Sequence, residues 1–486
     1  MKQSKEQIGS CVITPAESAT FARVSGDFNP LHIDPVLARR YQFGSTLIHG
    51  INGTLRALDT FFAGREHAAL KSLQVTFSKP ARQGDELALF AEQLSGAESG
   101  STDVHMEVHR SGKKLQSIEF SFSDIAAANL PAPQLPAPVT DQAPEPADIG
   151  LQQAEGLAGS TTMKWDPACF RALFPNLAKT LPEPQCATIL ASTKIVGMIC
   201  PGLNSVYARL HLTFATEAVD QATELRYRVT SVDARFSRVL MEVSNPVASG
   251  TIEAFFRPPP VSQASASDIA TLVDDDRFRG QTALVIGGSR GLGEVTAKVL
   301  AAGGANTIIT YASGHADATK VAADILANGG VCNTLKLDVL DGSDPHPLFD
   351  NPDRITHIYY MASPLIEKSD ARIWDAQLFG KYTDFYLNGL ANLLARFAGN
   401  PQYRDAQLSI YLPSTAFLDQ PEKGFFEYSV CKAATESFAL QIQSRYPRWR
   451  FFTPRLPRML TDQTSGIAGL DILDSARHIL ASLEGH

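Results

Sequence analysis

The first 257 residues show two periods of hydrophobic residues, which predict helices and strands before any motif is considered. One stretch repeats apolar residues at helical spacing, at Ile51, Leu55, Leu58 and Phe62. Four later stretches alternate apolar and polar residues, as half-buried strands do: 103–110, 116–122, 208–214 and 224–232. We therefore expect an α+β architecture here, with helical sequence followed by strands in each of two halves.

Short apolar strands alternate with helical stretches in the remainder of the chain. The expected strands are TALVIGG, NTIITYA, NTLKLDV, THIYYMA, LSIYLPS and WRFFTPR. Strands that alternate with helices in this way form doubly wound parallel sheets, so the sequence predicts a Rossmann-type α/β fold after the α+β part.

Two proline-rich stretches interrupt these patterns and predict linkers at residues 126–150 and 258–270. The expected domains are therefore residues 1–125, 151–257 and 271–486. The middle domain shows the same order of helical sequence followed by alternating strands as the first, but it contains no acid–histidine stretch. We interpret it as a diverged, non-catalytic repeat.

Composition narrows the class of protein. The 486 residues are 44% hydrophobic and 19% charged, which is typical of a globular protein rather than a disordered one. A net charge of −8 does not favour nucleic-acid binding, and no apolar run is long enough to cross a membrane. The six cysteines are scattered without metal-ligand spacing, so we expect no metal site and a cytoplasmic location.

The stretch SGDFNPLHID places Asp27 and His32 five residues apart. With TLIHGING and VTFSKPARQGDEL downstream, it resembles the MaoC-type (R)-specific enoyl-CoA hydratase/dehydratases, which have the hot-dog fold. The resemblance implies that Asp27 and His32 are the acid–base pair, that Asn29 orients them, and that the Gly50 N–H stabilises the developing oxyanion. The alternative is that Asp27 and Asn29 only cap a turn before Pro30.

The stretch VGMICPGLNSVYARLHLTF, residues 196–214, is similar to the non-catalytic halves of double hot-dog hydratases. That weaker resemblance implies a double hot-dog. It also implies a central helix that is incompletely wrapped, with a groove for a long acyl chain.

The turn ALVIGGSRGLG and the pair Tyr428 and Lys432, four residues apart, resemble the short-chain dehydrogenase/reductases. The resemblance implies that Tyr428 donates a proton to a carbonyl and that Lys432 lowers the tyrosine pKa and binds the ribose. It also implies that Asn388 anchors a water relay. Ser414 and Thr415 both remain candidates for the hydroxyl that holds the carbonyl oxygen.

Cofactor contacts are expected around the glycine turn and at the ends of the neighbouring strands. The NAD-type carboxylate is absent after the second strand, and Arg290 could pair with a 2′-phosphate, so we expect NADPH. The expected contacts are Gly287, Ser289, Arg290, Gly291, Leu292, Gly293, Tyr311, Ser313, Asp338, Tyr428, Lys432 and Thr461.

A reductase that forms a 3-hydroxyacyl thioester and a dehydratase that consumes it would catalyse consecutive steps. We expect a bifunctional enzyme of fatty-acid- or polyketide-like chain elongation, acting on acyl carrier protein or CoA thioesters, and a homodimer. One alternative runs both steps backwards, as hydratase and dehydrogenase of β-oxidation. Another is an acyl-thioester-binding scaffold with relic sites.

Overall fold

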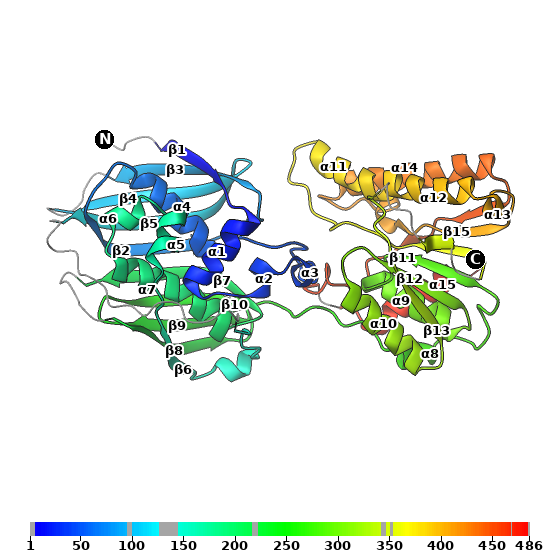
Figure 1. Cartoon of the computed structure of the whole chain (residues 1–486), viewed down its shortest axis with the longest axis horizontal. Helices are drawn as coiled ribbons and strands as arrows, with labels where there is room; N and C mark the ends of the chain where they lie inside the picture. Colours follow the sequence, from blue (N-terminus) through cyan, green and yellow to red (C-terminus); the bar gives the residue numbers. More distant parts are fainter. Residues whose placement is uncertain are drawn as a thin grey trace. The chain divides into compact units, whose positions relative to one another are not determined.

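The computed structural model of the chain describes residues 5–94, 100–125, 144–215, 222–341, 347–349, 353–467 and 469–484. It divides into two compact units, Met1–Pro259 and Pro260–His486, coloured blue to green and green to red in Figure 1. Most of the expected linker 126–150 lies outside the described residues. Its end is packed, because Ala147 and Asp148 bond to the loop around Gly202.

The first unit contains a ten-stranded antiparallel sheet. Its strands are β1 (Glu6–Val12), β2 (Ala68–Phe77), β3 (Glu86–Leu94), β4 (Thr102–Arg110), β5 (Lys113–Asp124), β6 (Ala158–Thr162), β7 (Ser205–Phe214), β8 (Glu224–Asp233), β9 (Arg238–Ser244) and β10 (Ala248–Phe256). Its helices are α1 (Pro15–Ser25), α2 (Pro30–Ile33), α3 (Pro35–Ala38), α4 (Gly50–Phe61), α5 (Pro167–Leu173), α6 (Leu177–Thr180) and α7 (Glu183–Lys194), with the short helices η2 (Leu151–Ala154) and η3 (Ile195–Ile199).

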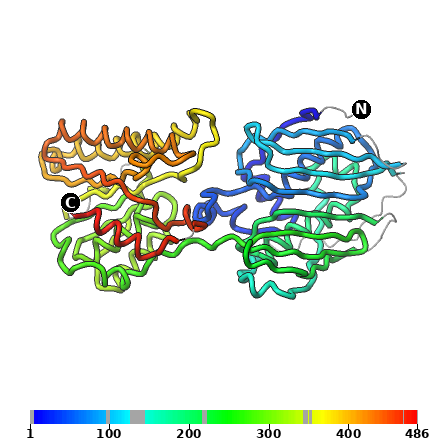
Figure 2. The backbone as a smooth tube through the Cα atoms, turned by 180° about the vertical axis from the view of Figure 1, so that it is seen from behind, coloured from blue at the N-terminus to red at the C-terminus, as the bar shows by residue number. Residues whose placement is uncertain are grey.

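The strand order shows that this unit is an internal repeat. The order β1-β3-β4-β5-β2 in one half is mirrored by β6-β8-β9-β10-β7 in the other, and β2 pairs with β7 to join them. Figure 2 shows these strands side by side from behind. One hydrophobic core runs through both halves, so the fold is a double hot-dog built on a continuous sheet.

The two central helices are α4 and α7. The apolar residues expected on a helix, Ile51, Leu55, Leu58 and Phe62, are fully buried against the first half of the sheet. In α7, every residue from Pro184 to Thr193 is buried. The expected incomplete wrapping of the second helix is therefore wrong, because small residues such as Ala187 and Ala191 let the surrounding elements cover it on all sides.

The second unit contains a six-stranded parallel sheet in the order β13-β12-β11-β14-β15-β17. This is the doubly wound order with a switch point between β11 and β14. The strands are β11 (Thr282–Ile286), β12 (Asn306–Tyr311), β13 (Val331–Lys336), β14 (His357–Tyr360), β15 (Leu408–Tyr411) and β17 (Trp449–Phe452), while β16 (Ser414–Thr415) pairs with β18 (Arg455–Leu456). All six expected strands are present.

Helices flank this sheet. The first of them lies within residues 258–270, where the sequence predicted a linker. Helix α8 lies within it, and Ala264 and Ile269 are buried in the core of the second unit because they are apolar. The helices are α8 (Ala266–Ala270), α9 (Gly291–Ala302), α10 (His315–Ala327), η4 (Pro347–Phe349), α11 (Ala376–Thr383), η5 (Asp384–Gly389), α12 (Leu390–Gly399), α13 (Pro401–Arg404), η6 (Ala416–Leu418), α14 (Phe426–Arg445) and α15 (Ile472–Ser482).

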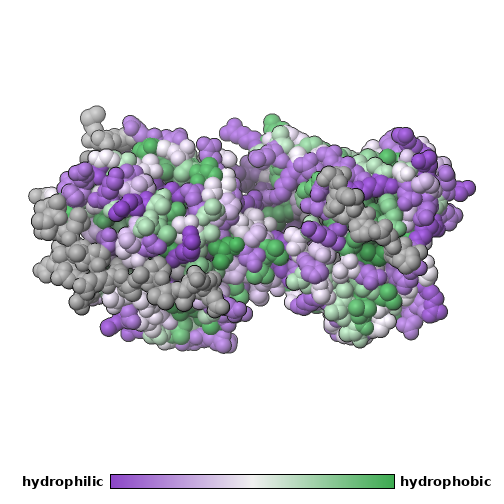
Figure 3. Space-filling model, in the orientation of Figure 1, coloured by the Kyte–Doolittle hydropathy of each residue, from purple (hydrophilic) through white to green (hydrophobic). Residues whose placement is uncertain are grey.

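Among the described residues, no helix combines the length and the apolar character needed to cross a membrane. The face drawn in Figure 3 mixes hydrophilic and hydrophobic residues.

Candidate active sites

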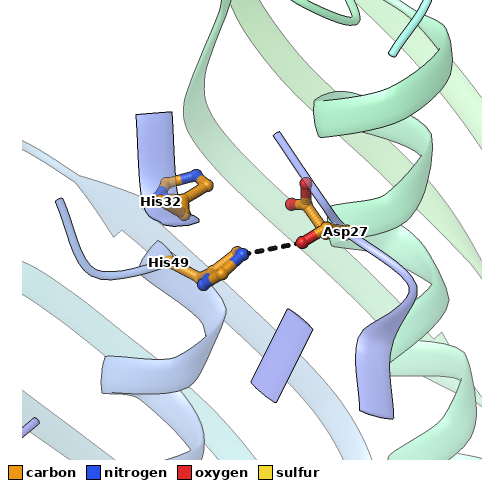
Figure 4. Close-up of side chains that lie close together, drawn as sticks. All are labelled: Asp27, His32 and His49. Carbon is orange, nitrogen blue, oxygen red and sulfur yellow. Dashed lines mark hydrogen bonds between the residues drawn. The ribbon is translucent and has the colours of Figure 1, made fainter. Parts of the chain in front are cut away.

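The first candidate site lies where the loop after α1 meets the start of α4. Asp27, His32 and His49 point toward one another there, and their nitrogen and oxygen ligand atoms all lie within 4.8 Å of each other (Figure 4). Asp27 is 1% exposed and His49 is 0% exposed, whereas His32 is only half-buried. The sequence singled out Asp27 and His32 but not His49.

Backbone carbonyls fix the protonation of both rings. His32 Nδ1 lies 3.0 Å from the Leu47 carbonyl oxygen, and His49 Nε2 lies 3.0 Å from the Asp27 carbonyl oxygen. Because a carbonyl only accepts, each of these nitrogens carries the hydrogen. The Nε2 atom of neutral His32 is therefore a lone-pair acceptor that can take a proton.

The second half of the unit holds the Asp27 carboxylate in place. Thr193 Oγ1, at the end of α7, donates to Asp27 Oδ2 over 2.7 Å, and the Asn29 N–H donates to Oδ1. The Asn29 side-chain amide donates in turn to the Gly197 and Gly202 carbonyls, 3.0 Å away each. The repeat that lacks an acid–histidine pair therefore supplies part of this site.

Burial governs the charges at this site. It raises the pKa of Asp27, and the hydrogen bonds from Thr193 and the Asn29 N–H oppose the shift. It lowers the pKa of His32 to about 3 and that of His49 to about 4. Both imidazoles are therefore neutral at physiological pH, and the pair offers a proton acceptor beside a carboxyl group that binds protons more readily than usual.

Gly50 is the first residue of α4, where N–H groups have no partner within the helix. The preceding His49 provides no side-chain cap. A Cβ at Gly50 would lie 2.7 Å from the Phe77 ring, so a larger residue would not fit. The Gly50 N–H as donor to the developing oxyanion stays a prediction.

Asp27, His32 and His49 could also be considered as metal ligands. The two imidazole rings, however, are stacked with their centroids 3.9 Å apart and an interplanar angle of 27°. Lone pairs in stacked rings run side by side rather than converging on one ion. We therefore keep the acid–base interpretation, and the absence of a metal stays a prediction.

The second candidate site begins at the glycine turn between β11 and α9. Gly287 has φ +76° and lies against the backbone of Ala362, and a Cβ at Gly293 would lie 2.1 Å from the Gly287 carbonyl oxygen. The turn that includes Ser289 and Leu292 is therefore tight enough for close approach by a phosphate. The Thr461 methyl group lies 4.0 Å from the Cβ position of Gly291, so Thr461 borders the same turn.

Tyr428, Lys432 and Thr415 meet at the carboxyl end of the sheet. Burial raises the pKa of Tyr428 to about 12, and a hydrogen bond with Thr415 opposes the shift. Ser414 instead donates to Glu436 Oε1 over 2.5 Å. Thr415 as the substrate-facing hydroxyl stays a prediction, which the contact of Ser414 with Glu436 supports.

Lys432 Nζ donates to the Pro413 carbonyl over 2.7 Å and lies 3.9 Å from the centre of the Tyr386 ring. Burial lowers the lysine pKa to about 8. The expected lowering of the Tyr428 pKa by Lys432 does not appear in this structure, where burial of the phenol outweighs other effects.

The role expected for Asn388, as the anchor of a water relay, stays a prediction. Its side chain is exposed and donates to Asp384 Oδ1. Tyr386 occupies the place beside Lys432 instead, and its hydroxyl lies 2.6 Å from Ser363 Oγ. Tyr386 and Asn388 both lie on the π-helical segment η5, where Tyr386 is buried and Asn388 is exposed.

The remaining expected cofactor contacts lie around the carboxyl edge of the sheet. Tyr311 ends β12 and bonds to His315, and Ser313 follows it on the exposed loop. Asp338 follows β13, where its carboxylate accepts from the Leu340 N–H. Arg290 lies in the glycine turn, 3.3 Å from the buried Asp462 carboxylate, an ion pair that the sequence did not predict.

Two segments of the chain match known families. Residues 1–114 match the family described as MaoC like domain, and residues 281–450 match short chain dehydrogenase. The chain joins a MaoC-like domain to a short-chain dehydrogenase domain.

Three curated relatives resemble parts of the chain. Probable dehydratase NIT22 of Ajellomyces capsulatus is 32% identical over 108 residues, 22% of this chain and 27% of that protein. NADPH-dependent aldehyde reductase 2, chloroplastic, of Arabidopsis thaliana is 28% identical over 179 residues, 33% and 64% of the two chains. Peroxisomal hydratase-dehydrogenase-epimerase of Saccharomyces cerevisiae (strain ATCC 204508 / S288c) is 34% identical over 80 residues, 16% and 9%. The matches span less than two thirds of each relative.

The buried histidines of the MaoC-like domain predict acid sensitivity. Their pKa values are lower when folded than when unfolded, so the unfolded chain binds more protons between about pH 6.5 and pH 4. The unfolding free energy should therefore fall as pH falls through this window, by about 1.4 kcal/mol per pH unit for each histidine. The raised pKa of Asp27 acts in the opposite direction and offsets part of the loss.

Thermal melts of this domain's transition in matched buffers measure the effect. His32→Gln should reduce the slope, whereas His478→Gln, at an exposed position of α15, should leave it unchanged. An identical slope in His32→Gln and the wild type would contradict the assignment.

The two hydroxyls of the short-chain dehydrogenase domain can be separated by substitution. Thr415→Val removes the hydroxyl that bonds to Tyr428 and should lower kcat for carbonyl reduction by roughly 100-fold. Ser414→Ala removes the bond to Glu436, so it should lower the Tm while kcat falls much less than in Thr415→Val. Turnover rates with a saturating cofactor measure the kcat of both variants, and thermal melts measure the Tm. A larger loss of kcat in Ser414→Ala than in Thr415→Val would reverse the assignment.

Proposed function

We propose that the protein is an NADPH-dependent 3-oxoacyl-thioester reductase and an (R)-3-hydroxyacyl-thioester dehydratase. The observation that carries the proposal is that one chain holds two acid–base sites of complementary chemistry. Asp27 faces His32 in the MaoC-like domain, and Tyr428 faces Thr415 in the short-chain dehydrogenase domain. The product of the second site is a substrate for the first.

In the reductase, Tyr428 gives its proton to the carbonyl oxygen while Thr415 bonds to the same oxygen. NADPH supplies the hydride that the carbonyl carbon receives. Lys432 lies on the same helix as Tyr428, where the Pro413 carbonyl and the Tyr386 ring hold it. It would bind the nicotinamide ribose of the cofactor. The product is a 3-hydroxyacyl thioester.

In the dehydratase, Asp27 and His32 act on the two reacting positions of the bound thioester. One group takes the proton from Cα and the other gives a proton to the 3-hydroxyl group, which leaves as water. The Gly50 N–H binds the carbonyl oxygen while negative charge develops on it. A trans-2-enoyl thioester remains. Thr193 and Asn29 keep the Asp27 carboxylate oriented throughout.

NADPH is favoured over NADH by the residues that follow β12. Tyr311, Ala312 and Ser313 include no carboxylate to bind a ribose 2′-hydroxyl. Arg290 lies in the glycine turn, where it can bind a 2′-phosphate by sharing its contact with Asp462. One matching relative is itself named as NADPH-dependent.

The alternative direction is hydration followed by oxidation, as the name of the matching yeast hydratase-dehydrogenase-epimerase would suggest. We favour reduction and dehydration because an NADPH site fits the biosynthetic direction. We place the reactions in chain elongation in the cytoplasm, on a CoA or acyl-carrier-protein thioester, in a homodimer.

Product analysis tests the proposal. A 3-oxoacyl thioester with NADPH should give the 2-enoyl thioester with loss of water, on one or both carriers. In Asp27→Asn the 3-hydroxyacyl intermediate should accumulate, and chiral chromatography should identify it as the (R)-isomer. An (S)-intermediate could not serve as the substrate of the dehydratase and would contradict the proposal of consecutive reactions. An absence of turnover in either direction would favour a scaffold that binds acyl thioesters.

A further inference from the structure

Lys432, on α14, is a buried cation that forms no ion pair with a carboxylate among the residues that the structure describes. Only 6% of the residue is exposed. Its ammonium group donates to the Pro413 carbonyl over 2.7 Å. The carboxylate of Glu436, one turn further along the helix, is instead paired with Arg455 over 2.8 Å. Because desolvation of an ammonium group is costly, a second group is needed to stabilise the charge.

The face of the Tyr386 ring meets this need. Lys432 Nζ lies 3.9 Å from the centre of that ring, a distance at which the electron-rich face of an aromatic ring attracts a cation. The attraction is stronger where water is excluded, and Tyr386 is itself only 3% exposed. The ring of Tyr428 is farther from the ammonium group, at 5.9 Å. Tyr386 is therefore the principal aromatic partner of the lysine.

The hydroxyl group of Tyr386 has a partner of its own. It lies 2.6 Å from the Oγ atom of Ser363, just beyond β14. Because Ser363 Oγ donates its hydrogen to the Pro364 carbonyl, the Tyr386 hydroxyl donates to Ser363. Burial raises the pKa of the Tyr386 phenol well above its usual range, so the side chain stays neutral. The lysine is thus stabilised by the ring and not by an ionised oxygen.

Neighbouring aromatic side chains fix the orientation of the Tyr386 ring. The Tyr382 ring stacks on it with centroids 6.3 Å apart, and the Tyr428 ring lies 6.0 Å away at an interplanar angle of 62°. All three tyrosines belong to one buried cluster. A ring packed in this way cannot turn freely, so its face stays toward Lys432.

Few groups determine whether Lys432 is charged. Burial lowers its pKa to about 8, and Cys431 and Glu436, both on α14, oppose the shift. Tyr386 on η5 and Tyr428 on α14 are the titratable groups whose rings lie near the ammonium group, and burial keeps both phenols neutral near pH 8. The segment before β16 contributes a neutral carbonyl. A modest change in these surroundings would therefore change the charged fraction of the lysine at physiological pH.

We propose that Tyr386 is a positioning residue of the reductase, whose ring holds the Lys432 ammonium group charged and in place for the cofactor ribose. The inference rests on the proposed reductase function and deepens it. Lys432 attracts the ribose hydroxyls as a cation, so the ring keeps it competent to a higher pH than burial alone would allow. Tyr386 thereby sets the upper pH limit of cofactor binding and of carbonyl reduction.

The test uses the full-length protein with two substitutions at one position. Tyr386→Phe keeps the ring and removes the hydroxyl, whereas Tyr386→Leu removes the ring and keeps an apolar side chain. Dissociation constants of NADPH and NADH are measured by cofactor fluorescence across the range in which lysine loses its proton, and kcat with a 3-oxoacyl thioester is measured over the same range.

In the wild type, cofactor affinity and kcat should both fall above about pH 8. Tyr386→Leu should move this limit to lower pH by about one unit or more, because a desolvated cation loses its contact with the ring. Tyr386→Phe should keep the wild-type limit, since the ring remains.

Tyr382→Leu is the matched control. Tyr382 is buried in the same cluster, and its ring packs against Tyr428 with centroids 5.7 Å apart, but the Lys432 ammonium group lies over the Tyr386 ring instead. The control should lower the Tm as Tyr386→Leu does and leave the pH limit unchanged. Tyr386→Met replaces the leucine variant if that variant does not fold. An equal shift of the limit in Tyr382→Leu would show a general loosening of the cluster and overturn the proposal.

The other outcomes separate the inference from the proposed function. An unchanged limit in Tyr386→Leu would overturn the inference, even if 3-oxoacyl thioesters are reduced. An equal shift in Tyr386→Phe would assign the effect to the bond with Ser363 and overturn the role of the ring. A cofactor-binding limit that shifts as expected, without turnover of any 3-oxoacyl thioester, would contradict the proposed substrate and support the inference.

Discussion

Asp27→Asn should abolish dehydration while carbonyl reduction continues, and Tyr428→Phe should abolish reduction while dehydration continues. Each substitution removes a proton-transferring group, an effect worth roughly 10²–10⁴-fold in rate. The two residues belong to separate compact units with separate cores. The loss at one site should therefore leave the other site folded and active.

Two separate assays measure this prediction: NADPH oxidation with a 3-oxoacyl thioester, and hydration of an enoyl thioester. Asp124→Asn, at an exposed end of β5, and Tyr446→Phe, just beyond α14, are matched controls that should retain both activities. Loss of both activities in either active-site variant would mean that the two reactions share one site.

The side chains that lie together as their spacing predicted are close to one another in sequence. Tyr428 and Lys432 share one face of α14 because they are four residues apart. Asp27 and His32 lie on one short loop, and the glycine turn connects β11 directly to α9. Local spacing also predicted the parallel sheet, since each apolar run is one strand.

The residues that the sequence missed depend on distant contacts or irregular helices. Thr193 reaches Asp27 across 166 residues, and Asp462 reaches Arg290 across 172. Nothing in the local sequence around Thr193 reports such a contact. Tyr386 lies beside Lys432 from the π-helical segment η5, a contact that spacing in a regular helix does not predict.

A second π-helical segment, η3, leads to the last prediction. It carries Gly197, and a Cβ at that position would lie 2.1 Å from Asp27 Oδ1 and 2.5 Å from its Cγ. Asp27 has little freedom to retreat, because Thr193 holds Oδ2 and the Asn29 N–H holds Oδ1. Gly197→Ala should therefore displace the carboxylate.

Displacement of a catalytic group by about 1 Å can cost on the order of 100-fold in rate, so Gly197→Ala should lower kcat for dehydration by that factor. Overpacking should also destabilise the MaoC-like domain by about 1–3 kcal/mol. Reduction by the short-chain dehydrogenase domain should not change. Gly150→Ala is the control, since its Cβ would meet only the end of the Gln153 side chain at 3.5 Å. Wild-type dehydration by Gly197→Ala would show that the position of Asp27 does not limit the reaction, and that the second half of the double hot-dog does not control it.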